Sequence, residues 1–65
     1  MTLDEASARF ERIREMAADY EAAHAEEDKF RHDVLMAIMS GCDNAKMLAS
    51  IAIATSAIRF PRYCA

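Results

Sequence analysis

Neither glycine nor proline occurs in the 37 residues from Leu3 to Met39. A run of this kind lacks the residues that turns usually require, so it favours a helix. Thr2 and Glu5 are spaced as a capping box, in which each side chain accepts a hydrogen bond from the other residue's amide. One helix over about 3–39 would be roughly 55 Å long at 1.5 Å per residue. A break near residues 24–28, where the apolar pattern thins, is the main alternative.

The apolar pattern of this run repeats every seven residues. One line of the pattern contains Ala6, Ile13, Tyr20, Glu27 and Val34. A stripe with this period winds slowly around a straight helix, so it predicts a left-handed supercoil with a partner helix. An ordinary amphipathic helix is the alternative, because Glu27 places an acid within the line.

A second, shorter helix is predicted after the first. Gly41 can adopt the left-handed conformation that ends a helix, and Asp43 or Asn44 can cap a helix over about 45–58. Pro61 disfavours helical angles at the preceding residue, so residues 59–65 form a tail. A short connection makes consecutive helices antiparallel. We therefore expect an all-α fold, with residues 1–65 forming one antiparallel helical hairpin.

The predicted hairpin cannot bury all of its apolar surface. Its second helix is apolar on two sides and covers less than half of the first helix. A domain of 65 residues also buries only about 60% of the surface that its unfolded chain exposes. We therefore expect a homodimer, either coiled-coil or four-helix-bundle-like. Its core and interface are predicted to contain Phe10, Ile13, Tyr20, Phe30, Val34, Ile38, Leu48, Ile51 and Ile58.

Charge and hydropathy exclude several classes of partner. Residues 1–33 carry ten acids against five Lys or Arg, whereas residues 34–65 carry one acid against three. An acidic half repels phosphates, so we expect no nucleic-acid binding. The longest apolar stretch, about 45–58, is shorter than the roughly 20 residues of a membrane span. Cys42 and Cys64 lack the spacing of a disulfide framework, so a reducing cytoplasm is the expected setting.

Polar residues of the first helix allow a metal site as an alternative. Glu21 and His24 form a Glu-x-x-His pair of the kind that di-iron bundles use. His24, Asp28 and His32 are spaced four apart on one face, as zinc ligands can be. The second helix offers no further carboxylate, so we expect no cofactor. Catalysis is not expected either, because Gly41 is the only glycine and two helices provide no evident substrate pocket.

The tail combines aromatic residues with arginines, a composition enriched at binding hot spots. It either folds back over the hairpin as a lid or anchors a partner protein. An acidic patch on the first helix could steer that partner into place. The predicted partner-binding residues are Glu26, Glu27, Asp28, Phe60, Arg62 and Tyr63.

One combination of features resembles small helical accessory proteins of bacteriophages and prophages of Gram-negative bacteria. It consists of the acidic segment 23–28 with its histidine, a glycine turn, an alanine-rich helix and a closing Phe60-x-Arg62-Tyr63-x-Ala65. The resemblance covers residues 20–65 and implies a protein that binds and modulates or inhibits a host protein, such as a defence system or a regulator. Two functions therefore remain open: an interaction protein in the cytoplasm of a bacterial host, and a metal-binding helical bundle.

Overall fold

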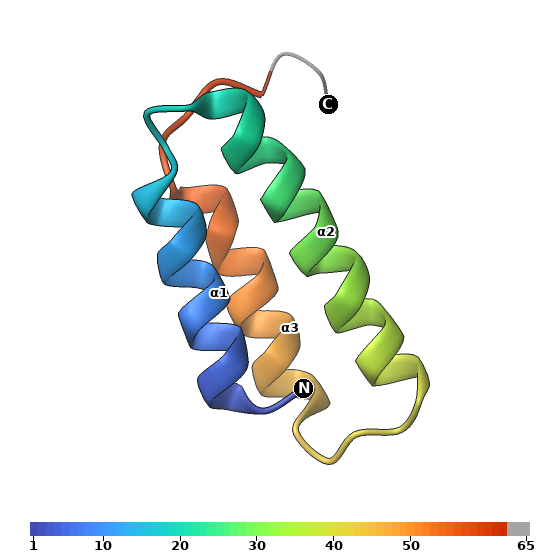
Figure 1. Ribbon diagram of the computed structural model, residues 1–65. Coiled ribbons are helices and arrows are strands. Elements are labelled where there is room, and N and C mark those ends of the chain that lie inside the picture. Colours follow the sequence, from blue (N-terminus) through green and yellow to red (C-terminus); the bar gives the residue numbers. More distant parts are fainter. Residues whose placement is uncertain (63–65) are drawn as a thin grey trace.

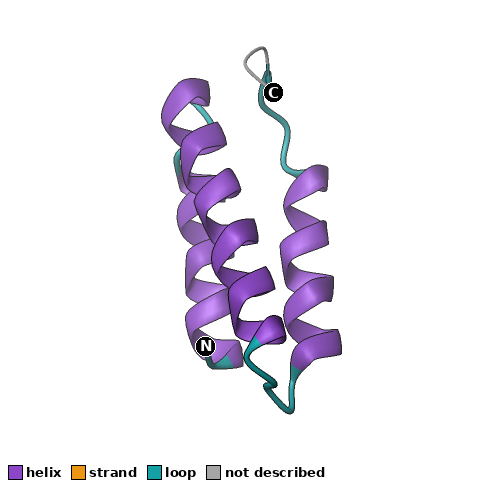
Figure 2. Cartoon of the chain, turned by 90° about the vertical axis from the view of Figure 1, so that its right-hand side faces the viewer, coloured by secondary structure: helices purple, strands orange, loops and turns teal. Residues whose placement is uncertain are grey.

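The computed structural model describes residues 1–62, which contain helices and no strand. Helix α1 spans Leu3–Glu15, α2 spans Tyr20–Met39 and α3 spans Ala45–Ala54, followed by the 3₁₀ turn η1 at Thr55–Ala57. Helices α1 and α3 run in one direction and α2 runs in the other (Figure 1). Each helix packs against the other two, so the chain forms a three-helix bundle (Figure 2).

The prediction of one continuous helix over 3–39 is wrong, because the chain breaks at residues 16–19. The alternative break near 24–28 is also wrong, since α2 is continuous there. The amide of Ala17 donates to the carbonyl of Arg14, and the amide of Asp19 donates to the carbonyl of Met16. Such i→i+3 bonds tighten and end a helix. The break folds α1 back onto α2 and α3, which buries apolar surface that a straight helix would expose.

Two of the predicted helix ends are confirmed. The amide of Glu5 donates to Thr2 Oγ1 at 3.0 Å, and the amide of Thr2 donates to Glu5 Oε1 at 3.2 Å. Gly41 follows α2 with a φ of +86°, the left-handed conformation expected there. Asn44 precedes α3 but does not cap it with its side chain. Its Nδ2 instead donates to the carbonyl of Met1 at 3.3 Å, which ties the N-terminus to the start of α3 (Figure 1).

The second predicted helix ends earlier than expected. Helix α3 stops at Ala54 rather than near residue 58, and η1 completes one tighter turn. The Thr55 hydroxyl donates to the carbonyl of Ala52 at 2.8 Å, a local bond that competes with regular helix. Ile58 is then extended, with a ψ of 126°. Residues 58–62 run from η1 towards the N-terminal end of α2 (Figure 1).

One chain builds its own core. The buried apolar residues come from all three helices and from the segment after η1: Ala6, Ile13, Ala23, Phe30, Val34, Leu48, Ala52, Ile58 and Phe60. Among the other predicted core residues, Phe10, Ile38 and Ile51 are half-buried against this cluster, whereas Tyr20 is 37% exposed. The expectation that the N-terminal half stays uncovered in one chain is corrected, because α1 packs against α3.

Candidate binding surface

Glu27 is an acid inside the core, with only 1% of its surface exposed. Arg62 donates to both carboxylate oxygens, from Nε to Oε1 at 2.9 Å and from Nη2 to Oε2 at 3.0 Å. Arg31 adds a longer contact from the next turn of α2, with Nη2 3.5 Å from Oε2. Two guanidinium groups therefore compensate a charge whose burial would otherwise be strongly destabilising.

The ionisation of this group follows from the same contacts. Burial by itself raises the pKa of the Glu27 carboxyl, but the hydrogen bond from Arg62 and the charge of Arg31 outweigh it. The pKa of Glu27 therefore lies below its ordinary value. The hydrogen bond to Glu27 in turn raises the pKa of Arg62. Both partners are consequently charged at neutral pH, and the contact is an ion pair.

Arg62 also organises the segment that carries it. Its guanidinium donates to the carbonyls of Thr55, Ile58 and Phe60 at 3.0, 3.1 and 3.2 Å. The same group stacks on the Phe60 ring, 3.9 Å from the ring centroid. Phe60 itself is only 8% exposed. Residues 58–62 thus lie as a lid against the bundle, fixed through one arginine.

This arrangement changes the predicted partner-binding set. Glu27 and Phe60 are buried, and Arg62 is occupied by contacts within the chain. Asp28 is exposed and Glu26 is half-buried, so both keep some contact with solvent. Tyr63 lies outside the described residues.

The predicted metal ligands are brought together only in part. His24, Glu27 and Asp28 hold ligand atoms within 4.8 Å of one another, whereas Glu21 and His32 do not belong to this cluster. His24 Nε2 lies 3.5 Å from Asp28 Oδ1. A cation placed here would compete with Arg62 for the Glu27 carboxylate and would face repulsion from Arg31. The present geometry suits an ion-pair network better than a metal centre.

An apolar groove runs between α2 and α3, and we refer to it as the α2–α3 groove. Its lining residues are Arg31, Val34, Leu35, Ile38, Ala49, Ala52 and Ile53. Leu35 on α2 and Ile53 on α3 are 65% and 69% exposed. Met39, one turn beyond Leu35, is 72% exposed. Several large apolar side chains that meet on one face form a patch, and a patch of this kind typically marks a contact site.

Small and charged residues shape this groove. Ala49 and Ala52 carry short side chains, so α3 fills little of the groove at these positions. Arg31 lies at the level of η1 and donates to Thr55 Oγ1 and Ser56 Oγ, both at 2.8 Å. Its Nε also donates to the carbonyl of Ala52 at 3.4 Å. These bonds join α2 to the end of α3, so this end of the groove is fixed before any partner arrives.

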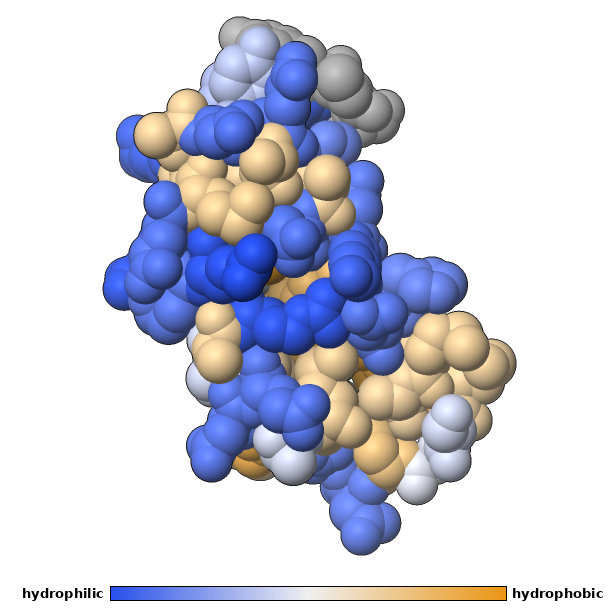
Figure 3. Space-filling view, viewed as in Figure 1, coloured by the Kyte–Doolittle hydropathy of each residue, from blue (hydrophilic) through white to orange (hydrophobic). Residues whose placement is uncertain are grey.

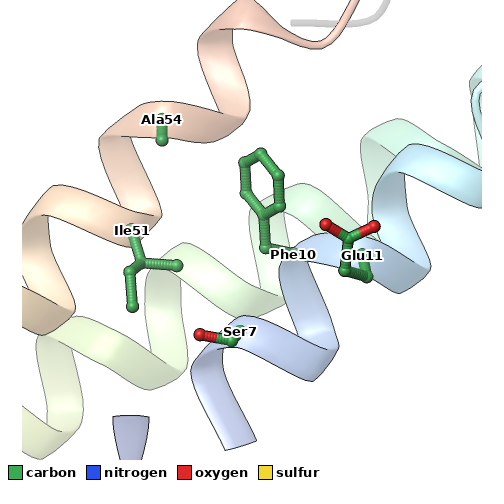
Figure 4. Close-up of a pocket in the computed structure, with 5 residues that line it drawn as sticks. All are labelled: Ser7, Phe10, Glu11, Ile51 and Ala54. Atoms are coloured by element: carbon green, nitrogen blue, oxygen red, sulfur yellow. The ribbon is translucent and has the colours of Figure 1, made fainter. Parts of the chain in front are cut away.

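A second hollow lies between α1 and α3 and is lined by Ser7, Phe10, Glu11, Ile51 and Ala54. Phe10 points from α1 towards α3, and Ile51 points from α3 towards α1 (Figure 4). Both side chains are already half-buried against the core. Glu11 borders the hollow and pairs with Arg14, which makes this rim charged. The more exposed apolar residues of the α2–α3 groove make it the stronger candidate for a binding surface.

On the face seen in Figure 1, hydrophobic residues gather in two places, around the connection between α1 and α2 and over the C-terminal end of α2 (Figure 3). At the second place, Met36 and Met39 are 46% and 72% exposed. Within residues 1–62, no helix combines the length and the apolar character needed to cross a bilayer.

Comparisons with protein-family models, with curated proteins and with solved structures find no match for this chain. Leu35, Met39 and Ile53 were not among the predicted binding residues. For Ile53, the sequence signal is the two-sided apolar character of the second predicted helix: one side of α3 borders the hollow against α1 and the other borders the groove.

Proposed function

We propose that this chain is a protein–protein interaction module that contacts other proteins through the α2–α3 groove. The observation that carries the proposal is the pair Leu35 and Ile53, which flank an apolar groove while 65% and 69% exposed. Covering such side chains releases ordered water and is favourable by roughly 25 cal/mol per Å² of apolar surface. A groove between two helices also suits the apolar face of a third helix.

The resemblance to phage accessory proteins supports a more specific role. In that role the chain binds a host protein, such as a defence component or a regulator, and modulates or inhibits it. The bacterial cytoplasm is the proposed setting, and the free thiol of Cys42 is compatible with a reducing compartment. The acidic N-terminal half would favour a target with a basic surface, mainly by raising the association rate.

The test compares a groove variant with a matched surface variant. Leu35→Asp places a charge at the groove, whereas Met47→Asp makes a similar change at a residue that is 58% exposed and does not line the groove. Each tagged protein, together with the unaltered chain, is incubated with lysate of a Gram-negative bacterium, and the retained proteins are quantified by mass spectrometry. Circular dichroism checks that all three proteins remain helical.

The proposal expects at least one host protein that the unaltered chain and Met47→Asp retain and Leu35→Asp loses. That protein must then bind the unaltered chain when both are purified, with a dissociation constant that Leu35→Asp raises at least tenfold. If every retained protein binds all three chains equally, the groove is not the contact surface and the proposal fails.

Metal binding is a second candidate function, supported by the cluster of His24, Glu27 and Asp28. Protein purified without a histidine tag is examined by elemental analysis and then titrated with zinc. A stoichiometric content that His24→Ala abolishes would support this function. Metal-free protein that binds no added zinc would exclude it.

A further inference from the structure

One face of α2 carries His24, Glu27 and Asp28, which stand three and four residues apart along the helix. His24 Nε2 and Asp28 Oδ1 are 3.5 Å apart, and a Glu27 carboxylate oxygen lies within 4.8 Å of both ligand atoms. Ligand atoms that share one zinc ion at about 2.0–2.2 Å lie roughly 3.4 Å from one another in a tetrahedral site. The first pair therefore already has this spacing. The Asp28 side chain is 65% exposed, so it has room to rotate towards Glu27.

Glu27 already binds a cation in the folded chain. Its carboxylate is buried, and both of its oxygens accept hydrogen bonds from Arg62, at 2.9 and 3.0 Å. A buried carboxylate needs a positive partner, because its charge has lost the water that would otherwise solvate it. Glu27 thus differs from a solvated surface acid: it is a cation-binding group whose present cation is a side chain of the same protein.

Arg62 can leave Glu27 without breaking the contacts within its own segment. Its guanidinium reaches α2 through Glu27, whereas its bonds to three backbone carbonyls stay within residues 55–62. Those bonds can persist when residues 58–62 lift away from α2. Lifting then exposes the Glu27 carboxylate to water and to dissolved ions beside His24 and Asp28.

We propose that a divalent cation such as Zn²⁺ and Arg62 are alternative partners of Glu27, so that an ion held by His24, Glu27 and Asp28 opens the lid. This proposal rests on metal binding, the second candidate function, and adds the group that the ion must displace. The two carboxylates together carry two negative charges, which match one divalent ion, and water completes the coordination. Arg31, 3.5 Å from Glu27, repels the ion, so binding to the closed chain is weak.

Displacement of Arg62 changes the surface of the protein as well as the metal site. Ile58 and Phe60 are 7% and 8% exposed while the lid is closed, and both reach solvent when it opens. The opened segment then presents an aromatic side chain and an arginine, the residue types enriched at binding hot spots. Lid and partner anchor are thus two states of the same segment, and the cation selects between them.

The test uses two substitutions that weaken the same contact but change the metal site in opposite ways. Arg62→Lys keeps the charge and loses the planar fork, so it competes less well for Glu27 and should lower the dissociation constant for zinc by roughly tenfold. Glu27→Gln also loosens the lid but removes a charged ligand, so it should raise that constant by roughly tenfold or more. Isothermal titration with zinc chloride measures both constants, and circular dichroism checks that each variant is folded.

His32→Ala is the matched control, because His32 lies on the same helix but outside the cluster. It should leave the dissociation constant for zinc unchanged. An effect of a loose lid alone would shift Arg62→Lys and Glu27→Gln in the same direction, so opposite shifts identify Glu27 as a ligand and Arg62 as its competitor.

A second measurement follows the lid in the unaltered chain, and it decides the question by itself if Arg62→Lys does not fold. At saturating zinc, the NMR signals of the Phe60 ring should move to the positions of an exposed phenylalanine. Unchanged Phe60 signals at saturation, or a folded Arg62→Lys that binds zinc no more tightly than the unaltered chain, would overturn the exchange. The metal-binding function itself would survive either result if His24→Ala still abolished binding. Failure of every chain to bind zinc would overturn both.

Discussion

Arg62 donates two hydrogen bonds to the carboxylate of Glu27, which precedes it by 35 residues. Glu27 is the one fully buried acid among residues 1–62. Because Arg62 also holds the carbonyls of residues 55, 58 and 60, this pair joins the centre of α2 to the whole segment after α3. The same contact therefore holds residues 58–62 against the bundle and keeps the buried Glu27 carboxyl ionised.

Removal of the arginine should be costly. Arg62→Ala leaves Glu27 buried with only the longer contact from Arg31, and breaking a buried pair costs about 3 kcal/mol or more. A chain of this length has a total free energy of unfolding of roughly 3–10 kcal/mol, so the variant should be close to unfolding at room temperature. Urea denaturation measures the loss. Arg14→Ala removes an exposed pair with Glu11 and should cost about 1 kcal/mol or less. Similar losses in both variants would contradict the central role of Arg62.

Acid should destabilise the fold partly through Glu27. Because its pKa in the folded state lies below the ordinary 4.5, the folded state binds its proton less readily than the unfolded chain. This contribution is complete above that ordinary value and disappears as the pH falls through the lowered pKa. Asp33, held by Arg9 at 2.8 Å, has its pKa lowered in the same direction. Thermal melting between about pH 7 and pH 3 should show the decline in stability, because this range spans the ordinary carboxyl pKa values of about 4.

Glu27→Gln isolates the contribution of one carboxyl to this decline. The variant should be less stable at neutral pH, but it should lose less of its remaining stability on acidification, because Gln does not titrate in this range. Parallel pH profiles for the two proteins would show that other carboxyls account for the acid sensitivity.

The packing of α1 can be tested at one position. Ile13 is 1% exposed, so Ile13→Ala should cost about 2–5 kcal/mol through lost burial and a residual cavity. Met47→Ala removes a comparable side chain that is 58% exposed and should change stability by about 0.5 kcal/mol or less. Denaturation at low micromolar protein concentration, chosen to keep association small, measures both. Equal effects would mean that α1 does not pack as described.

The start of α2 depends on a local bond. Asp19 accepts from the Ala22 amide at 3.4 Å, so Asp19→Ala should lower stability by about 1 kcal/mol. Asp19→Asn keeps an accepting oxygen and should retain most of the stability. If alanine and asparagine behave alike, the side chain does not cap α2, and the break at 16–19 is maintained by packing alone.

The sequence predicted local structure correctly where one or two residues determine it. Thr2 with Glu5 and Gly41 mark helix ends through their own hydrogen bonds and backbone angles, and both predictions are confirmed. The heptad line also identified Ile13 and Val34 as buried, each 1% exposed, but Tyr20 on the same line is 37% exposed and Glu27, predicted to bind a partner, is buried. The heptad line could not show that these residues would pack against other helices of the same chain rather than against a partner helix.

The break at residues 16–19 was not predictable in the same way. Met16, Ala17 and Ala18 are good helix formers, so the only local preference against a continuous helix comes from Asp19, which favours an N-cap. The turn is favoured by distant contacts, because it lets Ala6 and Ile13 reach the core shared with Phe30. Tertiary packing thus overrides propensity there. The candidate site was missed for a related reason: exposure of Leu35 and Ile53 depends on where α1 lies.

The distance along the chain between Glu27 and Arg62 also matters during synthesis. A ribosome adds about 5–20 residues per second, so Glu27 is made roughly 2–7 s before the arginine that neutralises it. Until then, the cation that the fold can place beside Glu27 is Arg31, at the longer distance of 3.5 Å. Complete packing around Glu27 at that stage would leave its charge poorly compensated, so the carboxylate must stay hydrated or take up a proton. The Glu27 charge is therefore fully compensated only after residue 62 has been added and has folded back onto α2.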